Sequence, residues 1–114
     1  MLRNLFHLPQ NGPTIAEIRP AELNQRIKQH DRMLLLDVRS PEEYAQDGHI
    51  TGSRLLPLPM LATRLDELPR DMPIVCVCRS GNRSRVACEM LLRHGFHDVT
   101  NLVGGMMAWK QVVK

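Results

Sequence analysis

The sequence predicts an α/β fold in which a mostly parallel sheet is covered by helices. Short apolar runs alternate along the chain with segments of helical periodicity, which is the pattern of such folds. The clearest strand, Ile74 to Val77, is apolar and β-branched. The clearest helix, Arg83 to His94, follows it after a short loop and stops at Gly95. With 114 residues, 43% of them hydrophobic, the chain is expected to form one domain with a core of its own.

The other elements are expected from the same two periodicities. Ile15 to Ile18 is a short first strand, and a helix over Ala21 to Gln29 follows, because Pro20 is well tolerated in the first turn of a helix. The apolar run from Met33 to Leu36, followed after Asp37 by Val38, predicts a buried strand over Met33 to Val38. Further along we expect a strand at Arg54 to Leu56, a helix at Met60 to Leu68, a strand at Val99 to Val103 and a helix at Met106 to Val113.

A capping box marks one more helix start. In Ser40-Pro41-Glu42-Glu43 the Ser40 hydroxyl can accept a hydrogen bond from the N–H of Glu43, whose carboxylate can reach back to the Ser40 N–H. The helix is short, because Gly48 ends it after Asp47.

Composition and punctuation limit what the chain can be. Prolines and a glycine interrupt residues 1–13, which we interpret as an N-terminal extension before a single domain over residues 14–114. Apolar runs such as Met33 to Leu36 are far shorter than the roughly 18 residues of a membrane-spanning helix. A net charge of +3 and four aromatic residues offer little to nucleic acids. We therefore expect neither a membrane nor a nucleic-acid partner.

The three cysteines argue for chemistry or packing rather than for cross-linking. Cys76, Cys78 and Cys88 cannot all pair within one chain, and this usage fits a reducing compartment, so the cytoplasm is the expected location. Cys76 lies within the best strand and Cys88 on the apolar side of the best helix, so both are expected to pack in the core. No nearby spacing suggests metal ligands, and no cofactor is expected.

The segment between the best strand and the best helix carries the strongest functional signal. It reads Cys78-Arg79-Ser80-Gly81-Asn82-Arg83-Ser84. Ligands of such sheets gather at the carboxyl ends of strands, where Cys78 lies. Gly81 allows the loop to turn its N–H groups inward as an anion cradle, and the helix adds the positive end of its dipole.

These features predict a lowered pKa and a nucleophilic role for Cys78. Arg79, Arg83 and Arg85 add positive charge around the sulfur, which favours the thiolate. The candidate catalytic residue is Cys78, and the candidate binding residues are Arg79, Ser80, Gly81, Asn82, Arg83 and Ser84. The alternative is that Cys78 is an ordinary buried residue at a strand end.

Four ordered motifs resemble those of the rhodanese family, the single-domain sulfurtransferases. They are Leu36-Asp37-Val38-Arg39 with Pro41, Glu43 and Tyr44; Gly48-His49-Ile50-Thr51-Gly52-Ser53; the Cys78 loop; and Leu102-Val103-Gly104-Gly105 with Trp109. The resemblance covers nearly everything from Thr14 to Trp109. It implies a five-stranded parallel sheet flanked by helices on both faces and a catalytic cysteine, Cys78, that carries a sulfane sulfur as a persulfide.

The same resemblance implies a sulfurtransferase of the thiosulfate:cyanide type. Cys78 would take sulfur from a donor such as thiosulfate or a persulfide and pass it to a thiophilic acceptor. Thiosulfate-active two-domain members commonly carry lysine where this chain has Ser80, and they tend to carry arginine near the position of Glu43. These departures count against thiosulfate as the physiological donor.

Two other functions stay open at this point. A sulfur-relay or regulatory module, with a protein donor or carrier as its partner and little small-molecule turnover, would have the same loop. A phosphatase or arsenate reductase of similar fold is the other alternative. Phosphatases of that kind have five residues between cysteine and arginine, whereas four separate Cys78 from Arg83, so less room remains for a tetrahedral phosphate.

Supporting roles are expected for residues at the end of the Met33 strand. Asp37 and Arg39 lie on the same rim as Cys78, and we interpret them as an ion pair that holds the loop. His49 lies in a glycine-flanked turn, where we expect its ring to hydrogen-bond to the backbone. No general base is required if Cys78 is already ionised.

Overall fold

The structure is a computed structural model that describes residues 14–113, so the predicted N-terminal extension lies outside the described residues. Five parallel strands form one sheet, in the order β1-β5-β4-β2-β3. This confirms the α/β fold with a five-stranded parallel sheet. The strands are β1 (Ala16–Ile18), β2 (Leu34–Asp37), β3 (Arg54–Leu55), β4 (Ile74–Val77) and β5 (Val99–Leu102).

Helices fill the connections between the strands. They are α2 (Pro20–Lys28), α3 (Pro41–Gln46), α4 (Leu58–Leu61), α5 (Asn82–Arg93) and α6 (Gly105–Val112), with a 3₁₀ turn, η1 (Leu65–Glu67). No helix within residues 14–113 has the length and apolar character needed to cross a membrane.

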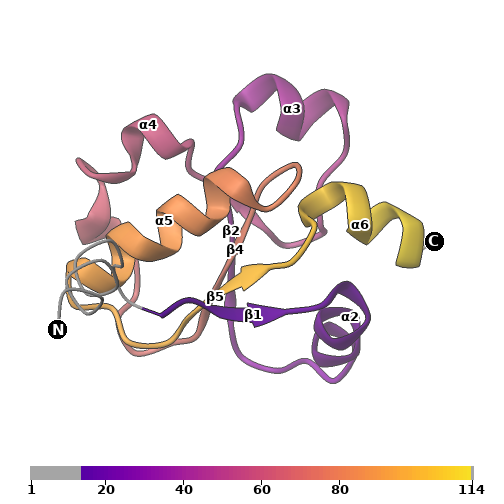
Figure 1. Ribbon diagram of the computed structural model, residues 1–114, viewed down its shortest axis with the longest axis horizontal. Coiled ribbons are helices and arrows are strands. Elements are labelled where there is room, and N and C mark those ends of the chain that lie inside the picture. Colours follow the sequence, from indigo (N-terminus) through magenta and orange to yellow (C-terminus); the bar gives the residue numbers. More distant parts are fainter. Residues whose placement is uncertain (1–13, 114) are drawn as a thin grey trace, which may run out of the picture.

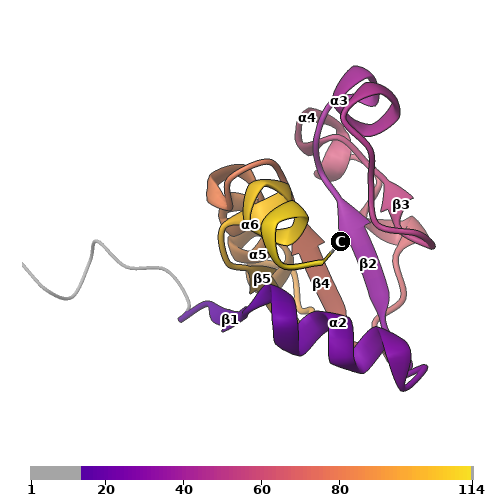
Figure 2. The same ribbon diagram turned by 90° about the vertical axis from the view of Figure 1, so that its right-hand side faces the viewer.

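The sheet is covered on both faces, as predicted. Figure 1 shows α4 and α5 together on one side and α2 and α6 together on the other, and Figure 2 shows the same layers after a quarter turn. The core is accordingly split in two. Leu36, Cys76 and Leu91 belong to the part under α5, whereas Val75 and Trp109 belong to the part under α2 and α6.

The central position of β4 places the candidate site at the middle of the sheet. All four residues of β4 are buried, which matches their apolar and β-branched character. Cys76 is in register with Leu36 on one neighbouring strand and with Asn101 on the other. The chain therefore leaves β4 at Cys78 between the carboxyl ends of β2 and β5.

One predicted helix was wrong. Leu61, Leu65 and Leu68 recur at helical spacing and are all buried, but a turn divides the segment into α4 and η1. The Thr63 hydroxyl donates to the carbonyl of Met60 at 3.1 Å, which satisfies that carbonyl locally. Three buried leucines are thus compatible with two short turns, because the periodicity reports which side is buried and not whether the backbone is continuous.

Candidate active site: a thiol within a ring of peptide groups

The Cys78 sulfur lies inside the loop that follows β4. Its side chain is buried, with 1% of the residue exposed. The Gly81 N–H donates to Sγ at 3.1 Å, and the Ser84 hydroxyl oxygen lies 3.2 Å from Sγ. The peptide nitrogens therefore face the thiol, as the sequence predicted for an anion cradle.

Hydrogen bonding determines the acidity of this thiol. Burial raises the pKa of Cys78, but hydrogen bonds from the Ser84 hydroxyl and from the backbone N–H groups of Ser84, Gly81 and Ser80 outweigh it, so the pKa lies below its ordinary value. The direction agrees with the prediction from the sequence. The thiolate is thus favoured by groups that carry no formal charge.

The start of α6 explains why these N–H groups point inward. The N–H of Met106 donates to the Cys78 carbonyl at 2.8 Å, and that of Met107 donates to the Arg79 carbonyl at 3.0 Å. The C=O and N–H of a trans peptide point in opposite directions, so an Arg79 carbonyl held by α6 directs the Ser80 N–H to the other side, toward Sγ.

Two glycines make this contact between the loop and α6 feasible. Gly81 has φ +105°, a left-handed conformation that glycine adopts without strain. At Gly105, which has φ +55°, a Cβ would clash with the Cys78 carbonyl and lie 2.6 Å from the Arg79 carbonyl carbon. Gly105 therefore provides the surface against which the cysteine loop packs.

The arginines take a different position from the one expected. The Arg83 guanidinium forms a two-point ion pair with the Glu43 carboxylate, at 2.7 Å for each contact. Within residues 14–113 no hydrogen bond links an arginine to the Cys78 sulfur. Arg79 and Arg85 are exposed. Positive charge thus surrounds the loop, while peptide groups and one hydroxyl make the direct contacts.

The Glu43 carboxylate joins three elements. It accepts from the Ser40 N–H at 3.0 Å, completing the predicted capping box of α3, and it also pairs with Arg83 at the start of α5. The hydrogen bond from Arg83 lowers the pKa of Glu43 to about 2. The sequence analysis did not predict the pairing of Glu43 with Arg83, because the capping box accounted for the Glu43 carboxylate within its own helix.

Asp37 and Arg39 form the predicted ion pair at the end of β2. Both side chains are about 1% exposed, and the Arg39 Nη2 lies 2.8 Å from an Asp37 carboxylate oxygen. The same nitrogen donates to the Gly48 carbonyl at 2.8 Å, which ties the end of β2 to the turn after α3. His49 also has the predicted structural contact, because its Nδ1 lies 2.8 Å from the Tyr44 carbonyl oxygen.

Asn101 is a buried polar residue near the thiol that sequence reasoning missed. It lies on β5 with 3% of its surface exposed. Its Oδ1 accepts a short hydrogen bond from the Ser84 hydroxyl, and its Nδ2 donates to the Gly81 carbonyl at 3.0 Å. An asparagine within a strand predicted to lie in the sheet was the available signal.

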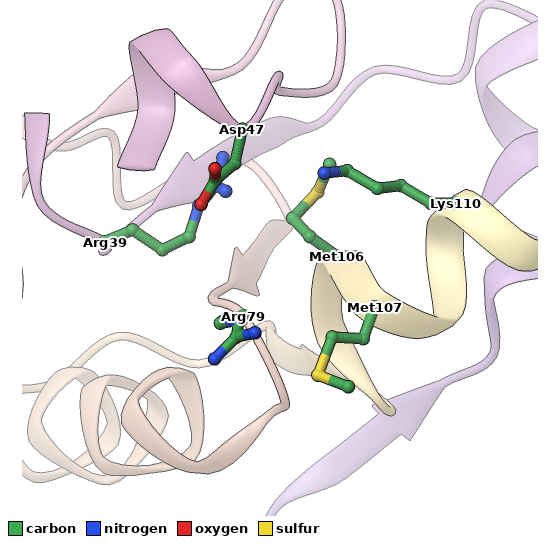
Figure 3. A pocket seen from close by; sticks show the side chains of 6 residues that line it. All are labelled: Arg39, Asp47, Arg79, Met106, Met107 and Lys110. Atoms are coloured by element: carbon green, nitrogen blue, oxygen red, sulfur yellow. The ribbon is translucent and has the colours of Figure 1, made fainter. Parts of the chain in front are cut away.

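A cationic pocket borders the loop on its α6 side. Its volume is about 200 Å³, and Figure 3 shows its lining side chains: Arg39, Asp47, Arg79, Met106, Met107 and Lys110. Three of these carry positive charge and one carries negative charge. The pocket thus suits a small anion, and its methionines offer polarizable apolar contacts.

Fold and site together define an α/β protein with a buried, hydrogen-bonded cysteine directly after the carboxyl end of its central parallel strand. The chain belongs to the rhodanese-like domain family, whose model matches residues 19–112. This match confirms the family that the four sequence motifs predicted.

Individual relatives extend the comparison. A protein named sulfurtransferase from Allochromatium vinosum is 41% identical over 95 residues, which are 83% of this chain and 88% of that protein. The crystal structure of a rhodanese-related protein from Thermoplasma volcanium has a TM-score of 0.78 and 32% identity, covering 86% of this chain and 93% of that one.

The same domain also occurs within longer proteins. The putative sulfur carrier protein YrkF of Bacillus subtilis is 35% identical over 103 residues, which are 90% of this chain and 55% of that protein. The reduced CoADR-RHD of Bacillus anthracis superposes with a TM-score of 0.79 and 33% identity, covering 87% of this chain and 17% of that one. This chain therefore spans only part of these two relatives.

Proposed function

We propose that this protein is a sulfurtransferase that carries a sulfane sulfur as a persulfide on Cys78. The observation that carries the proposal is the ring of donors around Sγ, formed by the Gly81 N–H, the Ser84 hydroxyl and the adjoining peptide groups. Such a ring stabilises a sulfur anion without the use of a fixed charge. The sulfurtransferase name of the Allochromatium vinosum relative supports the same activity.

The reaction consists of two nucleophilic displacements at sulfur. The Cys78 thiolate attacks the outer sulfur of the donor, a new S–S bond forms, and the donor's own bond to that sulfur breaks with its electron pair on the leaving group, which is sulfite when thiosulfate is the donor. An acceptor nucleophile such as cyanide or a thiolate then attacks the terminal sulfur, and the bond electrons return to Cys78. No external oxidant or reductant is needed.

The donor is proposed to be a persulfide rather than thiosulfate. Ser80 and Glu43 stand where thiosulfate-active two-domain members of the family tend to carry cations, and Glu43 in addition pairs with Arg83. The pocket with Arg79 and Lys110 supplies positive charge for an anionic donor or acceptor. The sulfur carrier name of YrkF supports a protein as the exchange partner, which is the relay form of the same chemistry. The cytoplasm remains our prediction for where this exchange occurs.

Intact mass tests the persulfide directly. The protein is incubated with a persulfide donor, with thiosulfate, or with a cysteine desulfurase and cysteine, and we expect a gain of one sulfur atom that cyanide removes as thiocyanate. Cys78→Ser should abolish the gain, whereas Cys88→Ser, a matched change at a buried thiol of α5, should retain it. A gain from the desulfurase alone would identify the relay form.

Two outcomes would contradict the proposal. One is a mass gain that persists in Cys78→Ser. The other is hydrolysis of an aryl phosphate by the wild-type protein, lost in Cys78→Ser, with no sulfur gain from any donor; this result would favour phosphatase chemistry.

A further inference from the structure

A chain of hydrogen bonds runs from Cys78 through Ser84 to Asn101 and back to the loop. The Cys78 sulfur lies 3.2 Å from the Ser84 hydroxyl, which donates to Asn101 Oδ1, and Asn101 Nδ2 donates to the Gly81 carbonyl at 3.0 Å. All four residues are buried, so water does not replace these contacts. The two displacement steps do not by themselves require Asn101.

The Gly81 carbonyl fixes which way the Asn101 amide points. A carbonyl oxygen only accepts hydrogen bonds, so it must face the NH₂ group of Asn101, and Oδ1 must then face Ser84. The Ser84 hydroxyl has a single proton, and it donates that proton in a hydrogen bond to Asn101 Oδ1. The lone pairs of Ser84 are left to face Cys78, an arrangement that suits a neutral thiol donating its own proton to Ser84.

When Cys78 is a thiolate, it needs the hydrogen bond from the same Ser84 proton. A charged Sγ needs the Ser84 hydroxyl to turn toward it, because lone pairs facing an anion repel it. Asn101 Oδ1 then loses its only donor among residues 14–113 while it stays buried, and an unsatisfied buried acceptor costs roughly 1–3 kcal/mol. Cys78 and Asn101 thus compete for a single proton.

The persulfide removes this competition. Once Sγ is bonded to a second sulfur, the negative charge moves to the terminal sulfur and Sγ becomes a weak acceptor. The Ser84 proton can then return to Asn101. We propose that Asn101 is a positioning residue that draws the Ser84 proton away from Cys78 and so favours the sulfur-loaded state over the free thiolate. The loading part rests on the proposed function, whereas the competition for the proton does not.

Other ionisable groups around Cys78 leave this competition intact. On β4 the neighbouring thiol is Cys76. Of the nearby arginines, Arg83 on α5 is paired with Glu43, and Arg79 is exposed. At the end of β2, Asp37 and Arg39 pair with each other. From β5 it is the uncharged Asn101 that reaches the Ser84 hydroxyl, and the first turn of α6 presents Gly105, Met106 and Met107. None of these side chains accepts the Ser84 proton within residues 14–113, apart from Asn101 itself.

The test is a double-mutant cycle on the ionisation of Cys78. The pKa is measured from the pH dependence of iodoacetamide alkylation, with the adduct mapped to Cys78 by mass spectrometry, in wild type, Asn101→Leu, Ser84→Ala and the double variant. Leucine branches at Cγ as asparagine does, and its two larger methyl groups offer no hydrogen-bond acceptor. We expect Asn101→Leu to lower the pKa of Cys78 by about one unit, because Ser84 then donates to the thiolate without a competitor.

The second half of the cycle separates this role from support of the loop. In the Ser84→Ala background, Asn101→Leu should leave the pKa unchanged, since no hydroxyl proton remains to compete for. If Asn101 acted only by holding the Gly81 carbonyl, its loss would loosen the N–H ring and raise the pKa in both backgrounds. A rise, or an equal shift in both backgrounds, would overturn the proposal.

A second substitution covers the case in which Asn101→Leu does not fold, as judged by circular dichroism and thermal unfolding. Asn101→Asp retains an acceptor oxygen toward Ser84, so the pKa of Cys78 should stay or rise. A fall would overturn the proposal.

The sulfur-loading equilibrium gives the closing measurement. With a donor and its leaving group at fixed ratio, and at a pH above the Cys78 pKa of both proteins, the loaded fraction by intact mass should correspond to an about tenfold smaller loading constant in Asn101→Leu, matching one pKa unit. A shifted pKa with an unchanged loading constant would overturn the loading part. Absence of loading in wild type would instead defeat the proposed function, while the alkylation cycle would still decide the competition for the proton.

Discussion

The two sides of the Cys78 loop use polar groups in opposite ways. Toward β5 and α6, the loop is held by peptide hydrogen bonds and by the neutral side chains of Ser84 and Asn101. Toward β2 and α3 the neighbouring polar contacts are ionic: Glu43 pairs with Arg83 at the start of α5, and the Asp37–Arg39 pair joins the end of β2 to the Gly48 carbonyl. Neutral dipoles touch the reacting sulfur, whereas the paired charges connect the surrounding elements.

The difference has a physical reason. A fixed positive charge beside the sulfur would hold the thiolate strongly and make it a weaker nucleophile, since nucleophilicity falls as the pKa falls. Several peptide donors lower the pKa more moderately and remain able to solvate a sulfur anion at either end of a persulfide. Ion pairs such as Glu43–Arg83 join neighbouring elements, and the Glu43 charge offsets much of the field that Arg83 places on Cys78.

The buried ion pair should be the most costly contact to break. Arg39→Leu leaves the Asp37 carboxylate buried without its partner, so we expect a loss of about 3–5 kcal/mol in the free energy of unfolding, measured by chemical denaturation. The double variant Asp37→Leu with Arg39→Leu should recover part of that loss, because no charge remains buried. Arg64→Ala, which breaks an exposed pair with Glu67, is the control, and we expect a much smaller loss because solvent screens that pair. Equal losses in the two arginine variants would contradict the assignment.

Gly105→Ala should disturb the neutral side of the loop. Its Cβ would enter the space of the Cys78 and Arg79 carbonyl groups, which the loop cannot vacate without losing the contacts from Met106 and Met107. We expect a loss of roughly 2–3 kcal/mol and a raised pKa of Cys78, because the inward N–H groups move.

Gly52→Ala is the matched control for that change. Gly52 also has a positive φ, of +86°, but beyond its chain neighbours no atom lies within 4 Å of the place that a Cβ would occupy. The variant should therefore lose only about 1–2 kcal/mol and leave Cys78 unchanged. If both alanines shifted Cys78 alkylation alike, close packing of α6 against the loop would not be the cause.

The sequence predicted what depends on local order along the chain. The apolar β4, the Ser40 capping box and the loop after Cys78 were all recognisable, because each is a pattern of neighbouring residues. Arg83 was expected to face Cys78, since nearness in sequence was the available guide. Its pairing with Glu43, forty residues away, depends on how α3 and α5 meet in space.

The contribution of Asn101 was hidden for the same reason. Nothing in the run Val99–Leu102 says that one side chain will lie against Ser84 and Gly81; the parallel register of β4 and β5 determines it. The break at Thr63 was missed because leucine spacing predicts a buried side and does not reveal a turn. Contacts between elements and interruptions within a periodic run are therefore the parts that needed coordinates.

The Glu43–Arg83 pair should have the smallest effect. Glu43→Gln keeps an oxygen for the capping box but removes the charge, and Arg83 is partly exposed, so we expect a loss of about 1 kcal/mol at pH 7. The pKa of Glu43 is lowered by its hydrogen bond with Arg83 to about 2, so the contribution is present above the unfolded value near 4.5 and disappears as the pH falls toward 2. Urea denaturation of wild type and Glu43→Gln at pH 7 and pH 2 should show the difference shrinking at the lower pH.

Arg83→Ala extends the same test to the sulfur itself. Because Glu43 already balances Arg83 and no hydrogen bond joins Arg83 to Sγ within residues 14–113, the pKa of Cys78 should rise by less than about 0.5 unit. A rise of a full unit or more would show that the guanidinium charge, and not the ring of neutral donors, keeps the thiol acidic. The contrast between the two sides of the loop would then have to be reversed.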